Sequence, residues 1–266
     1  MRMKWVFILT LMLSAVIPIL WLQQGCNSSY PSLTDMAIFT PTPTLQPDIV
    51  SNFESGGTAI NPNLVNYIPG NAGFTDNIPT TSPVDGVIAT PLVQSGIGYN
   101  SNYAIRVEAT WSDCATCGYP SAALSANLYS GTTYYDLPLS LTGIMFYLNI
   151  AAISWTGSTA PVFSFAVPLA STIPTSGGGT CTGSECYDHF NASLPTTVTG
   201  GYILMTIPFS TLKRAGFGSS IAPCSQTNIM DGCNNKEVMT LAWAVASNDI
   251  PGNYAVDFRL DNITFY

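Results

Sequence analysis

Apolar and polar residues alternate along four segments of the chain, with the two-residue period typical of a β-strand that buries one face. The apolar positions are the even ones in 144–150 and 256–260, and the odd ones in 163–167 and 241–245. A fifth segment, 202–207, is apolar on both faces. We therefore expect this segment to be a central strand of a sheet.

Clusters of Gly, Pro, Asn and Ser separate these segments, which predicts two packed antiparallel sheets. The expected fold class is all-β, a two-sheet antiparallel β-sandwich. Residues 49–266 are long enough for one such domain with a full core, in which we expect Trp243 to be buried. The only helical pattern is a short turn at 209–215, and the segment 61–98 carries no motif that we can place.

Residues 1–25 have the composition of an export signal. Arg2 and Lys4 precede an apolar core at 5–22, the usual order of charge and hydrophobicity in a signal peptide. The apolar run is close to the length that spans a bilayer, so an uncleaved anchor helix is the structural alternative. In both cases the sequence predicts a protein that works outside the cytoplasm.

Cys26 follows a small residue just after the apolar core, which suggests lipoprotein processing with Cys26 as the lipidated new N-terminus. Gln23 stands where the usual leucine of such a site would be. Residues 26–48 are polar and rich in Pro and Thr, a composition that favours an extended, semi-rigid linker. We expect an exported envelope protein, periplasmic or on the outer surface, that contacts the membrane through its lipid anchor.

Six cysteines remain when Cys26 is set aside, and they fall into three local pairs. The pairs are Cys114 with Cys117, Cys181 with Cys186, and Cys224 with Cys233. Local pairing in an exported chain predicts disulfides. Two alternatives stay open: convergence of two pairs as a four-thiolate metal site, and a redox role for the first pair.

The charge balance argues against nucleic acid as a partner. Beyond residue 25 the chain has five Lys and Arg residues against 15 Asp and Glu residues, a formal net charge of −10. Phosphate backbones would be repelled by such a surface.

The sequence offers little catalytic chemistry. Its one histidine, His189, would have to serve any Ser-His-Asp arrangement, and Asp188 beside it points the other way if the segment is extended. Gly-x-Ser-x-Gly elbows, phosphate-binding glycine loops and His-rich metal motifs are absent from the sequence. We therefore predict that the protein is not an enzyme. A glycoside hydrolase stays open as an alternative, because it needs only two facing carboxylates.

Sugar binding needs aromatic rings, which stack on the apolar faces of pyranoses, together with polar side chains for the hydroxyls. Tyr147 alternates with the apolar face of its segment and is expected to point outward. The other candidate rings lie in or beside expected loops: Trp111, Tyr119, Trp155 and Tyr187. A row of small residues at Ala242, Ala244 and Ala246 instead suggests a sheet face without a sugar site.

Asp188 and His189 directly follow the second cysteine pair, so a disulfide would hold their side chains in place. One interpretation is that both contact a polar ligand beside the ring of Tyr187. The other is that they only fix their loop through hydrogen bonds to the backbone. The sequence does not decide between the two.

Several motifs resemble those of a known family. They are Ile49–Gly57, Asp188–Phe190, Ile207–Phe209, Leu212–Gly218 and Phe258–Tyr266. In this order, over about residues 49–266, they resemble the galactose-binding-like jelly-roll domains of bacterial carbohydrate-binding proteins, similar to carbohydrate-binding module family 11 and its relatives. The resemblance implies a jelly-roll fold and non-catalytic binding of a glycan or polysaccharide.

Similar jelly rolls often hold a structural Ca²⁺ where the first and last strands meet. The resemblance therefore implies a calcium site with Glu54 and Asp261 as ligands, and carboxylate oxygens suit this hard cation. The alternative is that Asp261 only caps a strand turn.

The leading hypothesis is a non-catalytic carbohydrate-binding module on a lipid-anchored envelope protein. The alternative is a structural or protein-binding lipoprotein that keeps the fold without binding sugar, and a glycoside hydrolase is the third hypothesis.

Overall fold

The structure is a computed structural model that describes residues 48–77, 92–113, 121–157, 159–182, 186–216, 224–247 and 252–266. All of them belong to the unit Leu45–Tyr266. The expected export signal, Cys26, the linker up to residue 47, Tyr119 and the pair Cys114 and Cys117 lie outside the described residues. Within the described part of the chain, no helix has the length and apolarity needed to cross a membrane.

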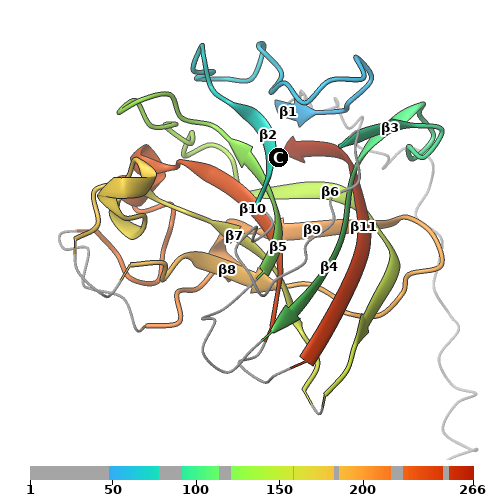
Figure 1. Cartoon of the computed structure of the whole chain (residues 1–266). Helices are drawn as coiled ribbons and strands as arrows, with labels where there is room; N and C mark the ends of the chain where they lie inside the picture. Colours follow the sequence, from blue (N-terminus) through green and yellow to red (C-terminus); the bar gives the residue numbers. More distant parts are fainter. Residues whose placement is uncertain are drawn as a thin grey trace, which may run out of the picture. The chain divides into compact units, whose positions relative to one another are not determined.

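The alternating segments form two antiparallel sheets, which confirms the predicted all-β sandwich (Figure 1). Sheet A has the order β3-β4-β11-β6-β9, and β1 also pairs with β11. Its strands are β1 (Asp48–Ser51), β3 (Val93–Ser95), β4 (Tyr103–Asp113), β6 (Gly143–Trp155), β9 (Ile203–Pro208) and β11 (Gly252–Phe265).

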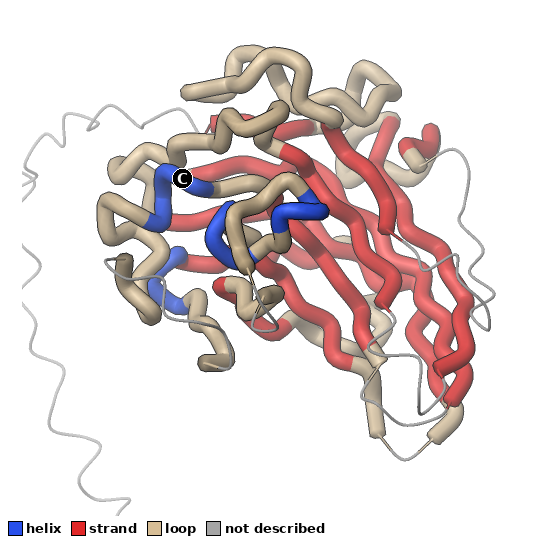
Figure 2. The backbone as a smooth tube through the Cα atoms, turned by 60° about the vertical axis from the view of Figure 1, so that its left-hand side comes forward, coloured by secondary structure: helices blue, strands red, loops and turns tan. Residues whose placement is uncertain are grey.

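Sheet B has the order β2-β5-β10-β7-β8. Its strands are β2 (Gly73–Asn77), β5 (Ser121–Asn127), β7 (Val162–Val167), β8 (Phe190–Ser193) and β10 (Thr240–Ala246). Among the residues that the structure describes, helical ones are confined to short 3-10 turns, seen as the blue segments in Figure 2. These are η3 (Ala170–Thr172), η4 (Thr175–Gly177), η5 (Phe209–Thr211) and η6 (Asn234–Glu237). The helical turn expected at 209–215 is thus limited to η5.

The apolar faces of the two sheets pack on each other in one core. Trp243 of β10 is fully buried, as predicted, and meets Phe146 of β6 edge-to-face with ring centroids 5.5 Å apart. It also packs on Phe165 of β7 at 5.3 Å. Aromatic rings from both sheets therefore hold the layers together.

The prediction that 202–207 is a central strand is wrong. β9 lies at the edge of sheet A, where it pairs only with β6. Its second apolar face is the outer one, and Leu204 on that face is 53% exposed. Ile203 and Met205 pack against the core from partly buried positions. A strand that is apolar on both faces is usual in a buried sheet but does not require one.

A β-bulge near the end of β11 changes which residues face the core. Even-numbered residues are buried up to Leu260, whereas Ile263 and Phe265 are buried after it. The register with β6 shifts between Asp261 and Thr264, and Asn262 takes a left-handed backbone with φ 49°. Asparagine tolerates this conformation better than most residues.

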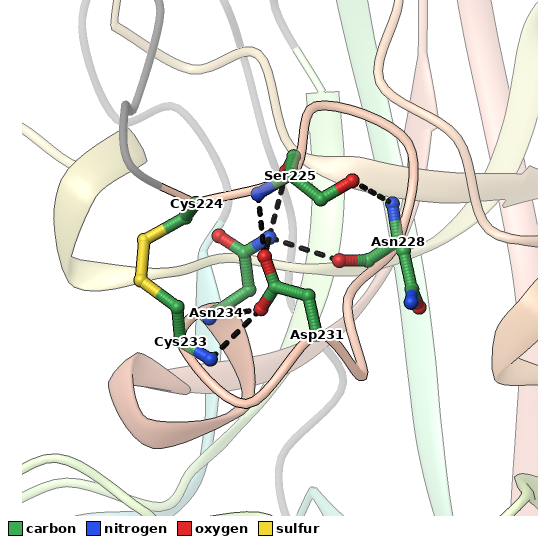
Figure 3. Close-up of a disulfide and its surroundings, with 6 residues drawn as sticks. All are labelled: Cys224, Ser225, Asn228, Asp231, Cys233 and Asn234. Carbon is green, nitrogen blue, oxygen red and sulfur yellow. Dashed lines mark hydrogen bonds between the residues drawn. A yellow bond between two sulfur atoms is a disulfide. The ribbon is translucent and has the colours of Figure 1, made fainter.

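Two of the three expected disulfides lie within the described residues and are formed, Cys181–Cys186 and Cys224–Cys233. These four cysteines are therefore not thiolate ligands of a metal. The second disulfide closes a loop that Asp231 and Asn234 organise from inside (Figure 3). The Asp231 carboxylate accepts hydrogen bonds from the backbone N–H groups of Ser225, Cys233 and Asn234.

Candidate functional site

The outer face of sheet A carries a dense group of polar and aromatic side chains. These residues alternate with the buried core residues of their strands, so they point away from sheet B. They are Arg106, Glu108 and Thr110 of β4; Ala255, Asp257 and Arg259 of β11; Met145, Tyr147 and Asn149 of β6; and Leu204 and Thr206 of β9. From Ala255 to Asp261 this face extends for about 20 Å along β11.

Arg106 lies at the centre of a charged group on this face. Its Nε and Nη2 donate to the two carboxylate oxygens of Asp257, at 2.8 and 2.7 Å. Its Nη2 also lies 2.9 Å from Glu108, and its Nη1 donates to Gln94 at 3.5 Å. The hydrogen bond to Asp257 is the main reason that the pKa of Arg106 is raised. Arg106 is therefore fully engaged by its neighbours.

Arg259 lies directly opposite Arg106 on β11, and Asn149 lies opposite Arg259 on its other side. Its nearest carboxylate is that of Asp257, 3.9 Å from Nη2. Its Nε is buried and has no hydrogen-bond acceptor among the described residues. The 3.9 Å separation from Asp257 leaves the Nη groups of Arg259 without a close carboxylate, so they can donate to another acceptor.

Three tyrosines gather at one end of the face. Tyr99 stacks on Tyr147 with ring centroids 3.7 Å apart, and Tyr202 meets Tyr99 edge-on at 5.8 Å. The hydroxyl of Tyr202 donates to the carbonyl of Ile97 at 2.6 Å, which ties β9 to the loop before β4. Burial raises the pKa of Tyr202. The rings form an amphipathic platform beside Arg259.

A cleft of about 400 Å³ lies at the ends of β4, β6 and β11, where the aromatic residues continue the core-side row of Val256 and Phe258 rather than the outer face. Three aromatic residues occupy successive strands there, because Tyr254 is opposite Trp111 on one side and Trp155 on the other. Trp111 and Tyr254 are buried and stacked at 5.4 Å, whereas Trp155 is 38% exposed. Hydroxyl and amide groups complete the lining: Thr110, Ser154, Thr156 and Asn253.

The structure thus brings three of the predicted aromatic residues to sheet A. Tyr147 points outward, as expected, although Tyr99 covers one side of its ring. Trp155 is at the end of β6 and lines the cleft. Trp111 is not in a loop, because β4 continues through it, and its ring is buried. Only Trp155 among the three offers a broadly exposed ring.

The loop at 187–189 belongs to a different part of the domain, directly before β8 of sheet B. Tyr187 is 61% exposed and meets His189 edge-on at 6.1 Å. Asp188 is buried, and its carboxylate accepts the backbone N–H groups of Ala215 at 2.8 Å and Gly216 at 3.1 Å. These bonds match the interpretation in which Asp188 fixes its loop.

His189 and Asp188 are both held by internal partners. The Nδ1 of His189 lies 2.8 Å from the hydroxyl of Thr172, and burial lowers the pKa of His189 to about 4. The Nη2 of Arg214 lies 3.5 Å from the Asp188 carboxylate, and its Nε donates to the Asp188 carbonyl. Both residues directly precede β8 of sheet B and are not part of the outer face of sheet A.

Asp261 is fully buried, whereas Glu54 is exposed. The Asp261 carboxylate accepts hydrogen bonds from the backbone of Tyr99 at 2.7 Å, the hydroxyl of Ser101 at 2.8 Å and the backbone of Asn262 at 2.7 Å. Burial is the main reason that the pKa of Asp261 is raised, and the charge of Glu54 adds to it. Nowhere in the described ranges do three or more metal-binding side chains gather. The expected calcium site stays a prediction.

Two carboxylates do lie close together on the outer face of sheet A. Glu108 and Asp257 are opposite each other on β4 and β11, and both contact the same nitrogen of Arg106. They lie side by side on one sheet rather than across a cleft, and each is paired with the guanidinium. A glycosidase would need one of them as a protonated acid facing the scissile bond.

Sequence reasoning missed Tyr99, Tyr202, Arg106, Arg259 and Asn149. Arg259 could have been found, because it alternates with Phe258 and Leu260 in a segment already recognised as a strand. Asn149 could have been found in the same way from β6. Tyr202 is the first residue of the expected strand 202–207 but precedes β9, and Tyr99 lies in a loop, so no alternation marked either ring as outward-facing.

Neither a protein-family model nor a curated protein sequence matches the chain. Solved structures resemble it. The family 11 carbohydrate-binding module of a cellulosomal cellulase of Clostridium thermocellum aligns with a TM-score of 0.43 and 14% identity, over 76% of this chain and 91% of that one. A family 11 module from the same organism, in complex with a β-1,3-1,4-mixed-linked tetrasaccharide, aligns with a TM-score of 0.42 and 11% identity, over 82% of this chain and 94% of that one.

A family 28 module specific for non-crystalline cellulose aligns with a TM-score of 0.36 and 11% identity, over 79% of this chain and 95% of that one. These proteins are of the class that the sequence motifs resemble. At such low identity and TM-score the likeness carries no argument about function, which has to be argued from the site itself.

Proposed function

We propose that the chain is a non-catalytic carbohydrate-binding module that binds a glycan along the outer face of sheet A. The observation that carries the proposal is the position of Arg259 and Asn149 beside the rings of Tyr99, Tyr147 and Tyr202 on this face. Hydrogen-bonding groups that face outward beside aromatic rings are what a sugar requires, because its hydroxyls need partners while its C–H faces stack.

Three features of the described residues support the proposal. Tyr99, Tyr147 and Tyr202 offer rings at one end of this face. The row of Ala242, Ala244 and Ala246 lies on sheet B, so it does not interrupt this face. Arg106 and its carboxylate partners on this face are held in place by ion pairs, which lowers the entropy lost on binding.

A glycan array on the purified full chain, with its disulfides intact, tests the proposal. Binding to a defined set of glycans without release of reducing ends supports a non-catalytic module. Turnover of a bound glycan would instead favour a glycoside hydrolase built on Glu108 and Asp257. A folded chain that binds no glycan would favour the structural or protein-binding alternative.

We also propose that Cys26 is lipidated and that the chain is exported to the cell envelope, where residues 26–48 act as a tether. The basic start, the apolar core and the position of Cys26 support this proposal. Metabolic labelling with a fatty acid, compared between the wild type and Cys26→Ala, tests it.

A calcium ion held by Glu54 and Asp261 is a further part of the proposal. Both residues are carboxylates, which are suitable ligands for calcium. Their negative charges repel each other when no cation lies between them. The bound ion would offset that repulsion and so stabilise the junction of the first and last strands.

A further inference from the structure

Arg259 is the best-placed side chain for recognising an acidic sugar. It and Arg106 are direct cross-strand partners in the register of β4 and β11. Side chains in such a pair lie about 5 Å apart at Cβ, and like charges there are destabilising unless they are compensated. The question is therefore where the compensating negative charge comes from.

Asp257 and Glu108 compensate Arg106 but leave Arg259 almost unpaired. Asp257 gives both of its oxygens to Arg106, at 2.8 and 2.7 Å, whereas Arg259 lies 3.9 Å from it. Glu108 lies 2.9 Å from Arg106. The distances thus assign both carboxylates to one of the two arginines.

The other acidic residue of this strand does not serve Arg259 either. The oxygens of Asp261 accept hydrogen bonds from Tyr99, Ser101 and Asn262. The side chain of Arg259 is only 24% exposed, and its buried Nε has no acceptor among the described residues. A largely buried guanidinium without a close counter-charge is costly, and an anion that pairs with its Nη groups would lower that cost.

The shape of the group favours a carboxylate. A guanidinium presents parallel N–H donors that match two carboxylate oxygens, and such bidentate pairs are stronger than bonds to neutral hydroxyls. Asn149 on the neighbouring strand can bind the adjacent hydroxyls, and the ring of Tyr147, two residues along β6, lies next to it. We infer that Arg259 receives the carboxylate of a uronic acid residue in the bound glycan.

The charges around Arg259 also limit how acidic this glycan can be. Glu108 lies on β4 and Asp257 lies two residues from Arg259 along β11, and the chain beyond residue 25 has a net charge of −10. A continuous polyuronate would be repelled by both. The preferred ligand is therefore an otherwise neutral oligosaccharide with isolated glucuronic acid residues.

The inference rests on the proposed function, and one experiment separates the two. The affinity of the full chain is measured by calorimetry for a glucuronic-acid-containing oligosaccharide and for the same oligosaccharide with its carboxyl group reduced to an alcohol. We expect the acidic form to bind about 10- to 100-fold more tightly. Added salt is expected to weaken the acidic form more than the reduced form.

Variants then locate the effect. Arg259→Gln is expected to remove the preference, so that the acidic and the reduced form bind this variant with equal affinity. Lys236→Gln, which removes one charge from an exposed position in η6, is the matched control and should keep the preference. Thermal unfolding of each variant verifies that it is folded.

Equal affinity for the two forms, or a preference that survives Arg259→Gln, would overturn the inference and leave the proposed function standing. A folded wild-type chain that binds neither form nor any other glycan would overturn the proposed function, and this inference with it.

Discussion

The ring of Tyr99 lies on the ring of Tyr147, with centroids 3.7 Å apart and planes at 19°. The two residues come from distant parts of the chain, one from the loop before β4 and the other from β6. The backbone N–H of Tyr99 also donates to Asp261, so the loop is fixed at two points. The stack links the tyrosine end of the outer face of sheet A to the junction of the first and last strands.

Tyr99→Phe tests this relationship without disturbing the ring stack. The hydrogen bond with the Tyr99 hydroxyl is the main reason that the pKa of Tyr147 is raised. Its removal should lower the pKa of Tyr147 toward the ordinary value of about 10. An NMR titration of ring-labelled tyrosine, assigned with Tyr147→Phe, measures the shift. An unchanged pKa in Tyr99→Phe would show that the two hydroxyls are not coupled.

His189 should make the stability of the domain depend on pH. Burial lowers its pKa to about 4, the charge of Asp188 favours its protonation, and that of Arg214 opposes it. The unfolded chain takes up the proton near pH 6.5, whereas the folded chain does not until about pH 4. The contribution of neutral His189 to the free energy of unfolding is therefore complete above pH 6.5. It is lost as the pH falls toward 4, by up to roughly 3 kcal/mol.

Urea unfolding of the wild type and His189→Asn across this pH range measures that contribution. Asparagine can still reach Thr172 but does not titrate. The difference between the two proteins should change steadily from pH 6.5 to 4. A constant difference would show that His189 titrates normally in the folded domain.

Asp188→Asn distinguishes the two interpretations of the loop that contains Asp188. Arg214 and Asp188 have side chains that are 3% and 1% exposed, so the substitution leaves a buried guanidinium without its carboxylate. We expect a loss of about 3–5 kcal/mol in the free energy of unfolding, and an unchanged glycan affinity below the melting temperature. A selective loss of affinity at wild-type stability would make Asp188 a ligand contact instead.

Calcium should stabilise the domain if Glu54 and Asp261 hold it. Removal of the ion with a chelator is expected to lower the melting temperature, because only the folded chain brings the two carboxylates together. Glu54→Gln should reduce this shift, whereas Glu237→Gln, which removes a carboxylate from η6, should not. A melting temperature that is insensitive to both chelator and calcium would contradict the proposed ion.

Much of the fold followed from the period of the apolar residues. Trp243 and the strand faces of 144–150 and 256–260 were predicted correctly, since burial of one sheet face imposes this alternation. The edge position of β9 was not predicted, because Leu204 makes its outer face apolar and a strand that is apolar on both faces looks like a central one. The bulge at Asn262 was also missed, since it shifts the period by one residue without a marker in the composition.

The candidate site was harder to predict than the fold. The alternation of its segment placed Tyr147 on the outer face. The ring that stacks on it, Tyr99, comes from a loop whose path no local sequence pattern specifies. The pairing of Arg106 with Asp257 depends on the register between β4 and β11, which are separated by more than a hundred residues. Cross-strand register of this kind is set by the whole sheet.

The measurement that tests the central claim most directly is the affinity of the best glycan from the array for three variants of the full chain. Tyr147→Ala and Asn149→Ala alter two positions on the outer face of sheet A, and Val162→Ala removes an exposed side chain from the outer face of sheet B. We predict that each of the first two weakens binding about tenfold, at unchanged folding, and that Val162→Ala stays within about twofold of the wild type. Wild-type affinity in both sheet A variants, or a loss confined to Val162→Ala, would contradict the proposal that the glycan binds on sheet A.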